Sequence, residues 1–169
     1  MKKKILIFIL LNILTLNTKA EIVYIDINFI LNSSDVGKNL NTYLETVKNQ
    51  NLLKYEKIEN DLVNKEKSLI AQQNILDKEQ FKKKLKKLTS EVQKYRSDKK
   101  VSLEELNNIK IDKTKEILLA LNPIITKYVD ENSISIVIPK KNIVVGRKNL
   151  DITNQIIKLL NNNITKLEF

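Results

Sequence analysis

The central part of the chain repeats apolar residues at the spacing of paired helices. Between about residues 35 and 131, apolar side chains recur every three or four positions in two runs. The second run is the more regular and passes through Phe81, Leu85, Leu88, Val92, Tyr95, Leu106 and Ile109. The first run passes through Leu40, Leu44, Val47, Tyr55, Ile58, Leu62 and Leu69, with a shift of register near Asn51. Heptad spacing predicts two long helices that pack along a seam as a coiled coil.

The two predicted helices are separated by capping residues. Asp77 is a candidate N-cap for the second helix, and Gln80 stands at the matching capping-box position three residues later. We therefore expect the first helix to end near Asn74 and a turn near residues 74–77. A helix of about 40 residues is roughly 60 Å long. The helical hairpin over residues 35–131 must therefore project from the remainder of the chain.

Short β-branched runs flank this hairpin and predict a small β body. Ile22–Ile27 and Ile134–Ile138 are both suited to strands. Pro139–Asn142 suggests a turn, after which Ile143–Val145 predicts a further strand in a β-hairpin with Ile134–Ile138. An amphipathic helix is expected over residues 154–162. The predicted body therefore combines residues 21–34 with residues 132–169.

The amino terminus has the layout of a cleavable signal peptide. Three lysines follow Met1, an apolar run extends from Ile5 to Leu16, and a possible cleavage site ends at Ala20. The apolar run is too short to span a bilayer comfortably. We expect residues 1–20 to be removed and the mature protein to be exported; an uncleaved amino-terminal anchor is the alternative.

Composition excludes several classes of function. The 169-residue sequence contains no His and no Cys, so histidine-based nucleophilic pairs, thiol chemistry, imidazole or thiolate zinc sites and disulfides are all excluded. Its two glycines, Gly37 and Gly146, fit neither a Rossmann nor a P-loop phosphate motif. Adjacent carboxylates such as Glu104 and Glu105 diverge around a helix and form no acid–base pair. We therefore expect no enzyme activity and no cofactor or metal.

Lysines are concentrated just after the predicted turn. The sequence carries a formal net charge of +10. One interpretation is a solvated helix face in a lysine-rich chain; another is a basic tip that attracts an anionic membrane surface or acidic segments. The absence of interleaved aromatic residues argues against nucleic acid as a partner. The basic arm tip is defined by Lys78, Lys82, Lys83, Lys84, Lys86 and Lys87.

A proline lies within the second predicted helix. Pro123 removes a backbone donor and crowds the preceding turn, so we expect a kink where the arm enters the body. The kink could be a tolerated bend or a pivot that lets the arms spread.

Five segments outside the middle of the arm carry a likeness to known proteins: Ile22–Asp26, Ile30–Lys38, Leu121–Ile125, Glu131–Ile138 and Leu150–Thr153. Together they resemble the Skp/OmpH family of periplasmic chaperones. Where the family often has glycine after Glu-Asn, this chain has Ser133, and Asn132 is expected to adopt the left-handed conformation instead. The resemblance implies a jellyfish-like homotrimer, mainly α, in which a short-stranded trimerisation sheet carries helical-hairpin arms.

The resemblance also implies an ATP-independent periplasmic holdase that binds unfolded outer-membrane β-barrel proteins and prevents their aggregation. A structural coiled-coil tether without chaperone activity is the alternative. Clients would contact apolar side chains on the arm, although these same side chains could simply pack within the hairpin. The candidate client-binding residues are Tyr43, Leu52, Leu53, Tyr55 and Val63.

Overall fold

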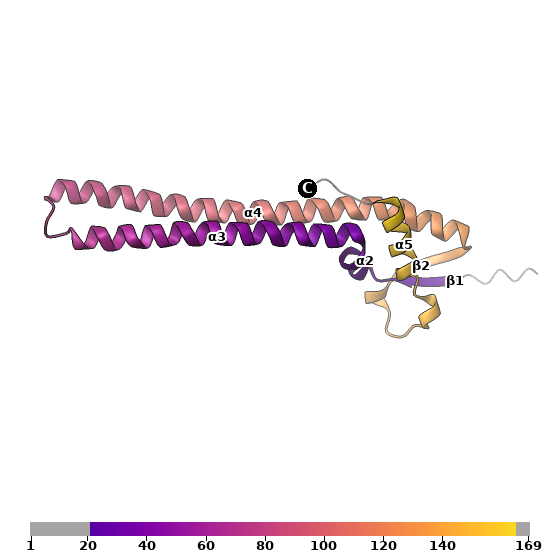
Figure 1. Cartoon of the computed structure of the whole chain (residues 1–169). Coiled ribbons are helices and arrows are strands. Elements are labelled where there is room, and N and C mark those ends of the chain that lie inside the picture. Colours follow the sequence, from indigo (N-terminus) through magenta and orange to yellow (C-terminus); the bar gives the residue numbers. More distant parts are fainter. Residues whose placement is uncertain (1–20, 165–169) are drawn as a thin grey trace, which may run out of the picture.

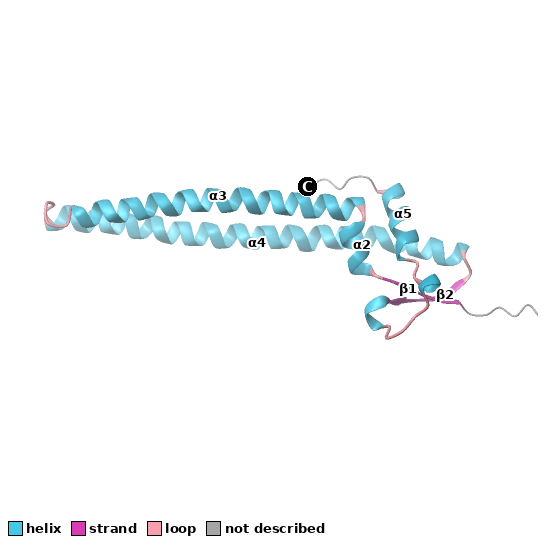
Figure 2. Cartoon of the chain, turned by 60° about the horizontal axis from the view of Figure 1, so that its bottom comes forward, coloured by secondary structure: helices cyan, strands magenta, loops and turns pink. Residues whose placement is uncertain are grey.

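The computed structural model describes residues 21–164, and most of these residues are helical (Figure 2). Along the chain the elements are β1, α2, α3, α4, β2, the 3-10 helices η1 and η2, and α5. Their bounds are Glu21–Ile25, Ile27–Ser33, Asp35–Ala71, Lys78–Glu131, Ile134–Pro139, Lys140–Asn142, Lys148–Leu150 and Thr153–Asn163. The predicted signal peptide, residues 1–20, and residues 165–169 lie outside the described residues.

Helices α3 and α4 lie side by side as one long hairpin that extends from a small body (Figure 1). At 1.5 Å rise per residue, the 37 residues of α3 span about 55 Å and the 54 residues of α4 about 80 Å. Seam residues Leu40, Tyr55, Leu62 and Leu69 are buried between the helices or against the body. The mainly helical fold with a projecting arm is thus confirmed.

A short loop joins the two helices at the far end of the arm (Figure 1). Helix α3 ends at Ala71, slightly before the predicted Asn74, and α4 begins at Lys78. The Asp77 carboxylate accepts a hydrogen bond of 2.8 Å from the Gln80 backbone N–H. This bond satisfies one of the free N–H groups at the start of α4. The predicted N-cap at Asp77 is therefore confirmed.

The body contains a sheet of two parallel strands, β1 and β2. The whole arm lies between β1 and β2 in the sequence and brings the chain back to the end of the sheet at which β1 begins. The two strands therefore run parallel. Tyr24 of β1 pairs with Ile138 of β2. On its other side, Tyr24 forms a bridge with Asp151, and the Ile152 N–H donates to the Tyr24 carbonyl at 3.0 Å. Both edges of β1 are therefore occupied.

The predicted β-hairpin after residue 134 is wrong. Pro139 ends β2, η1 follows it, and Ile143–Val145 form no strand in the structure. Val144 is 99% exposed. The 3-10 helix η1 turns the chain over Lys140–Asn142, and the Tyr24 hydroxyl of β1 holds the following loop by donating to the Arg147 carbonyl at 3.2 Å. The residues after Pro139 therefore pass to β1 and form an exposed loop instead of a partner strand for β2.

One hydrophobic core joins the sheet, the helices of the body and the base of the arm. Helix α5 has the amphipathic character that the sequence predicted. The buried members come from every surrounding element: Val23, Ile25, Ile30, Val36, Leu40, Ile117, Leu121, Ile134, Ile152, Ile156 and Leu160. Since α3 and α4 both contribute buried residues, the arm is rooted in the core rather than joined to it by a linker.

Helix α4 continues through Pro123 to Glu131. Proline inside a helix removes one hydrogen bond. Ile124 and Ile125, which follow it, pack against the body core. Pro123 therefore lies at the junction of arm and body, and the expected kink and pivot there remain predictions.

Ser133 is the residue that adopts the left-handed conformation after α4. Its φ is 54°, whereas Asn132 has φ of −107°, so the expectation for Asn132 is wrong. The Asn132 side chain instead donates a hydrogen bond of 2.8 Å to the Tyr128 carbonyl. This bond holds Asn132 at the end of α4. The chain therefore changes direction at Ser133.

We predict that Ser133→Gly stabilises the protein. A left-handed conformation costs a non-glycine residue about 1–2 kcal/mol, and the greater freedom of glycine in the unfolded chain offsets part of this gain. The net gain should be about 0.5–1 kcal/mol in the free energy of unfolding, measured by urea titration. Asn132→Gly is the control and should give no gain, because it removes the bond to Tyr128. Equal stability of Ser133→Gly and the parent would contradict the prediction.

Candidate functional site

A pair of tyrosines crosses the seam in the middle of the arm. The rings of Tyr55 on α3 and Tyr95 on α4 meet edge to face, with centroids 6.0 Å apart. The Tyr55 hydroxyl donates to the Asp98 carbonyl at 2.8 Å, and the Tyr95 hydroxyl donates to the Glu59 carboxylate at 2.6 Å. Polar groups within an apolar seam favour one register of the two helices. The tyrosine pair therefore fixes how α3 and α4 align.

Lys99 completes this polar layer. Its ammonium donates to the Tyr95 hydroxyl at 3.0 Å and lies 3.8 Å from the Glu59 carboxylate. The hydrogen bond to Tyr95 raises the pKa of Lys99 above its ordinary value. The Lys99 ammonium therefore joins the polar layer across the hairpin, although its side chain is exposed.

Beside the tyrosine pair the arm has a shallow apolar groove of about 460 Å³, which we call the mid-arm groove. Leu52 of α3 and Leu103 of α4 form its walls and are 64% and 58% exposed. The complete lining is Lys48, Asn51, Leu52, Tyr55, Glu56, Glu59, Lys99, Ser102, Leu103 and Leu106. Exposed leucines on both walls make this groove a surface that can bind apolar groups.

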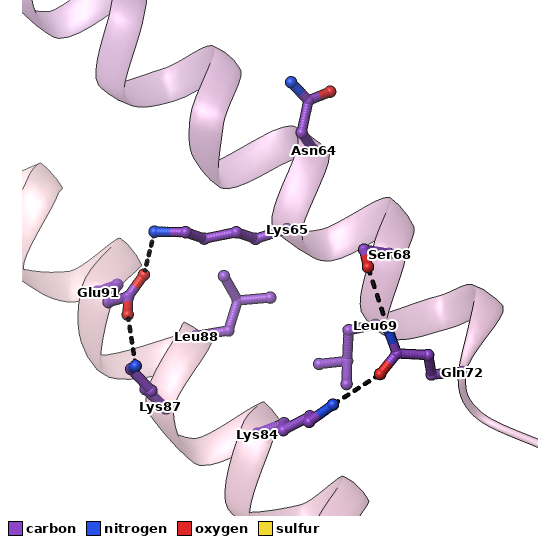
Figure 3. A pocket seen from close by; sticks show the side chains of 9 residues that line it. All are labelled: Asn64, Lys65, Ser68, Leu69, Gln72, Lys84, Lys87, Leu88 and Glu91. Carbon is purple, nitrogen blue, oxygen red and sulfur yellow. Dashed lines mark hydrogen bonds and ion pairs between the residues drawn. The ribbon is translucent and has the colours of Figure 1, made fainter. Parts of the chain in front are cut away.

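A second groove lies near the end of the arm, and we call it the tip groove (Figure 3). Its lining is Asn64, Lys65, Ser68, Leu69, Gln72, Lys84, Lys87, Leu88 and Glu91. Lys65 donates to Glu91 across the hairpin at 2.9 Å, and Lys84 donates to Gln72 at 2.7 Å. Hydrogen bonds to Asp61 and Glu91 raise the pKa of Lys65. The tip groove is thus polar and basic.

Comparison with known families and structures identifies this architecture. The family model described as outer membrane protein (OmpH-like) matches residues 21–160. The chain belongs to the OmpH-like family. Membership of this family of periplasmic outer-membrane chaperones supports a chaperone role in general and gives no reason to expect an enzyme.

One solved structure shares the fold of this OmpH-like chain closely. It is a candidate outer membrane chaperone (OmpH-like) from Caulobacter crescentus CB15, with a TM-score of 0.83 and 17% sequence identity. The likeness covers 89% of each chain. At this identity the likeness shows the fold alone. No curated protein matches the sequence significantly.

The candidate client-binding residues of the OmpH-like chain fall into different environments. Leu52, Leu53 and Val63 are exposed on α3, and Tyr43 is half-buried. Tyr55 is only 4% exposed, and both its ring and its hydroxyl are engaged within the hairpin. Tyr55 therefore packs in the seam, in line with its place in the first heptad run, and its ring also contributes to the lining of the mid-arm groove. Only Leu52 and Tyr55 of the five line that groove.

The six lysines of the basic arm tip are all exposed on the first turns of α4. Lys84 bonds to Gln72, and Lys87 lies 3.9 Å from the Glu91 carboxylate. The structure therefore brings Lys84 and Lys87 into the tip groove, whereas the other four lysines do not line it.

Several exposed apolar side chains of the OmpH-like arm are not among the candidate client-binding residues. They include Ile70, Leu103, Ile111 and Leu119. Their positions outside the heptad seam are the sequence signal that could have identified them. Leu103 is the most important of these because it forms one wall of the mid-arm groove.

Within residues 21–164, no group of acidic side chains is arranged to hold a metal ion. No helix among the described residues has the length and apolar character needed to cross a membrane.

Proposed function

We propose that the protein is a periplasmic holdase that binds unfolded outer-membrane β-barrel proteins without ATP and keeps them from aggregating. The observation that carries this proposal is the long arm with large apolar side chains exposed to solvent, such as Leu52 and Leu103. Exposed apolar surface of this kind marks a site of interaction with another molecule. Neither a Rossmann nor a P-loop motif is present, which is consistent with action without nucleotide.

A homotrimer is part of the same proposal. Ile136 on β2 is exposed, and Val144 and Val145 are exposed in the loop after η1. β2 pairs only with β1 in the described sheet, and an open strand edge with exposed apolar side chains favours association with another copy. Association through the body would place several arms around one client, so that many weak contacts act together.

The basic arm tip supports a second contact within this proposal. Its lysines are exposed at the end farthest from the body (Figure 1). Such a cluster attracts anionic groups over about a Debye length, roughly 8 Å at physiological salt. We propose that the tip steers the chaperone toward an anionic membrane surface while the rest of the arm holds the client.

The test is to mix residues 21–169 with a urea-unfolded outer-membrane β-barrel protein, dilute the urea without nucleotide, and measure solution mass and light scattering. A trimer that forms a soluble complex with one client is the expected result. A stable oligomer beside precipitated client would overturn the holdase and favour the alternative, a structural coiled-coil tether. The exposed apolar side chains favour the holdase, because a tether has no need of them.

A further inference from the structure

The two grooves of the arm open on opposite faces of the hairpin. In an α-helix each residue turns the chain by about 100°, so residues 16 apart differ by about 160° around the axis. This separation relates Leu52 in the mid-arm groove to Ser68 in the tip groove on α3. The same separation relates Leu103 to Lys87 on α4. On both helices, the residues that line the mid-arm groove therefore lie on one face of the hairpin and those that line the tip groove lie on the other.

The surface of the mid-arm groove is mainly apolar. The Tyr55 hydroxyl donates to the Asp98 carbonyl, so that the tyrosine contributes its ring to the groove. Lys99 and Glu59 are engaged with Tyr95. Leu52 and Leu103 are the exposed apolar side chains of the lining, and the exposed charged side chains Lys48 and Glu56 stand beside them.

The two grooves differ in the net formal charge of their lining residues. The mid-arm groove has two lysines, Lys48 and Lys99, and two glutamates, Glu56 and Glu59, so its formal charge is zero. The tip groove has three lysines and one glutamate, which gives +2. A groove without net charge favours neither sign of client charge, so the exposed leucines decide what it binds, and these favour uncharged apolar side chains.

We propose that the mid-arm groove is the primary contact site for clients and accepts uncharged apolar side chains of an extended, unfolded polypeptide. This inference rests on the proposed holdase function. It assigns client contact to the face that carries Leu52 and Leu103. It also separates Leu52 from its neighbour Leu53, which is 67% exposed but lies about 100° away around α3.

Two matched double variants test the assignment. Leu52→Ser with Leu103→Ser removes both walls of the groove. Leu53→Ser with Leu119→Ser removes two leucines that are at least as exposed but do not line it. The first variant should weaken binding of an unfolded outer-membrane β-barrel protein about tenfold, since two apolar contacts are lost, and the second by less than about twofold. Equal effects of the two variants would overturn the proposal.

A second measurement does not depend on mutating the walls to serine. Because the sequence contains no Cys, Leu103→Cys or Leu119→Cys introduces a single thiol that can carry a unique photo-crosslinker. Crosslinks to the client from position 103 and few from position 119 are expected. Crosslinks from position 103 to another copy of the chain, with or without client, would show that the groove is an arm–arm contact and would overturn the proposal.

The outcomes separate this inference from the proposed function. If the parent protein does not keep the client soluble, the holdase proposal fails. If the parent protein holds the client and the variant lacking Leu52 and Leu103 holds it equally well, only the mid-arm groove proposal fails. Circular dichroism and solution mass of each variant establish that the helical arm and the oligomer are retained.

Discussion

Gly37→Ala should destabilise the protein by about 3–5 kcal/mol, although the same change usually stabilises a helix. Gly37 is buried in the first turns of α3, where the chain turns sharply from α2. A Cβ atom on Gly37 would lie 1.8 Å from the Leu31 carbonyl oxygen and 2.7 Å from its carbonyl carbon. No atoms can approach this closely, so α2 and α3 would have to separate.

The surroundings of Gly37 leave no inexpensive way to relieve the overlap. The atoms in the way belong to the backbone of α2, and the adjacent Ile30 and Val36 are completely buried in the body core. Moving α2 would therefore open the core. Because this corner lies at the base of the arm, the substitution should also loosen the attachment of the arm to the body.

Urea unfolding of residues 21–169 measures the effect, with Gly146→Ala as the control. A Cβ atom on Gly146 would lie 2.8 Å from Cε1 of the Tyr24 ring, a buried side chain whose hydroxyl donates to the Arg147 carbonyl. This overlap is with a side chain and is much less severe than that at Gly37, so the control should cost about 1–2 kcal/mol. A Gly37→Ala protein as stable as the parent would contradict the close approach of α2 and α3.

Local periodicity explains which parts of this fold could be predicted from the sequence. The seam residues Leu62 and Leu69 recur at helical spacing, and the N-cap at Asp77 depends on residues only three positions apart. Such signals are contained within a few turns of one helix. The arm and its capping could therefore be predicted without knowledge of the rest of the chain.

Contacts between distant segments explain what the sequence analysis missed. Ile143–Val145 has the composition of a strand, but the segment after it is bound to Tyr24 of β1 through Arg147 and Asp151. Only the folded body reveals these contacts, which keep the loop away from β2. The tight contact of Gly37 with Leu31 likewise depends on the angle between two helices rather than on residue type.

In the candidate site, too, one feature could be predicted from nearby residues and another could not. The exposure of Leu52 follows from its position beside the seam. The role of Leu103 depends on which residue of α4 lies opposite Leu52, and this is fixed by the register of two antiparallel helices. A heptad pattern alone does not give that register, whereas the tyrosine pair Tyr55 and Tyr95 shows it directly.

Asp151→Asn should destabilise the body by about 2–3 kcal/mol at pH 7, because it weakens several charge-assisted hydrogen bonds at once. The Asp151 carboxylate accepts hydrogen bonds from the Thr153 backbone N–H at 3.0 Å and from the Thr153 hydroxyl. It also pairs with Lys140 at 3.1 Å. Thr153 in turn accepts a hydrogen bond from the Asp26 N–H at 2.9 Å. The carboxylate therefore links β1, η1 and α5.

The pH dependence of this effect follows from the protonation of Asp151. Burial alone would raise the pKa of the carboxyl, but hydrogen bonds from Thr153 and the nearby Lys140 ammonium outweigh burial and lower the pKa below 3.8, its ordinary value. A carboxyl whose pKa is lower in the folded state stabilises the fold above the pKa of the unfolded chain. This stabilisation is lost as the pH falls through the lower, folded value.

Urea titrations at several pH values distinguish the carboxylate from its exposed partner. The difference in free energy of unfolding between the parent and Asp151→Asn should be constant from pH 7 to about pH 5 and should shrink below about pH 4. Lys140→Met, the control, removes only an ion pair whose lysine is half-exposed and should cost less than about 1 kcal/mol. A difference for Asp151→Asn that grows on acidification would contradict a lowered pKa. Equal costs for the two variants would instead show that Lys140, rather than the link to Thr153, gives the carboxylate its stabilising role.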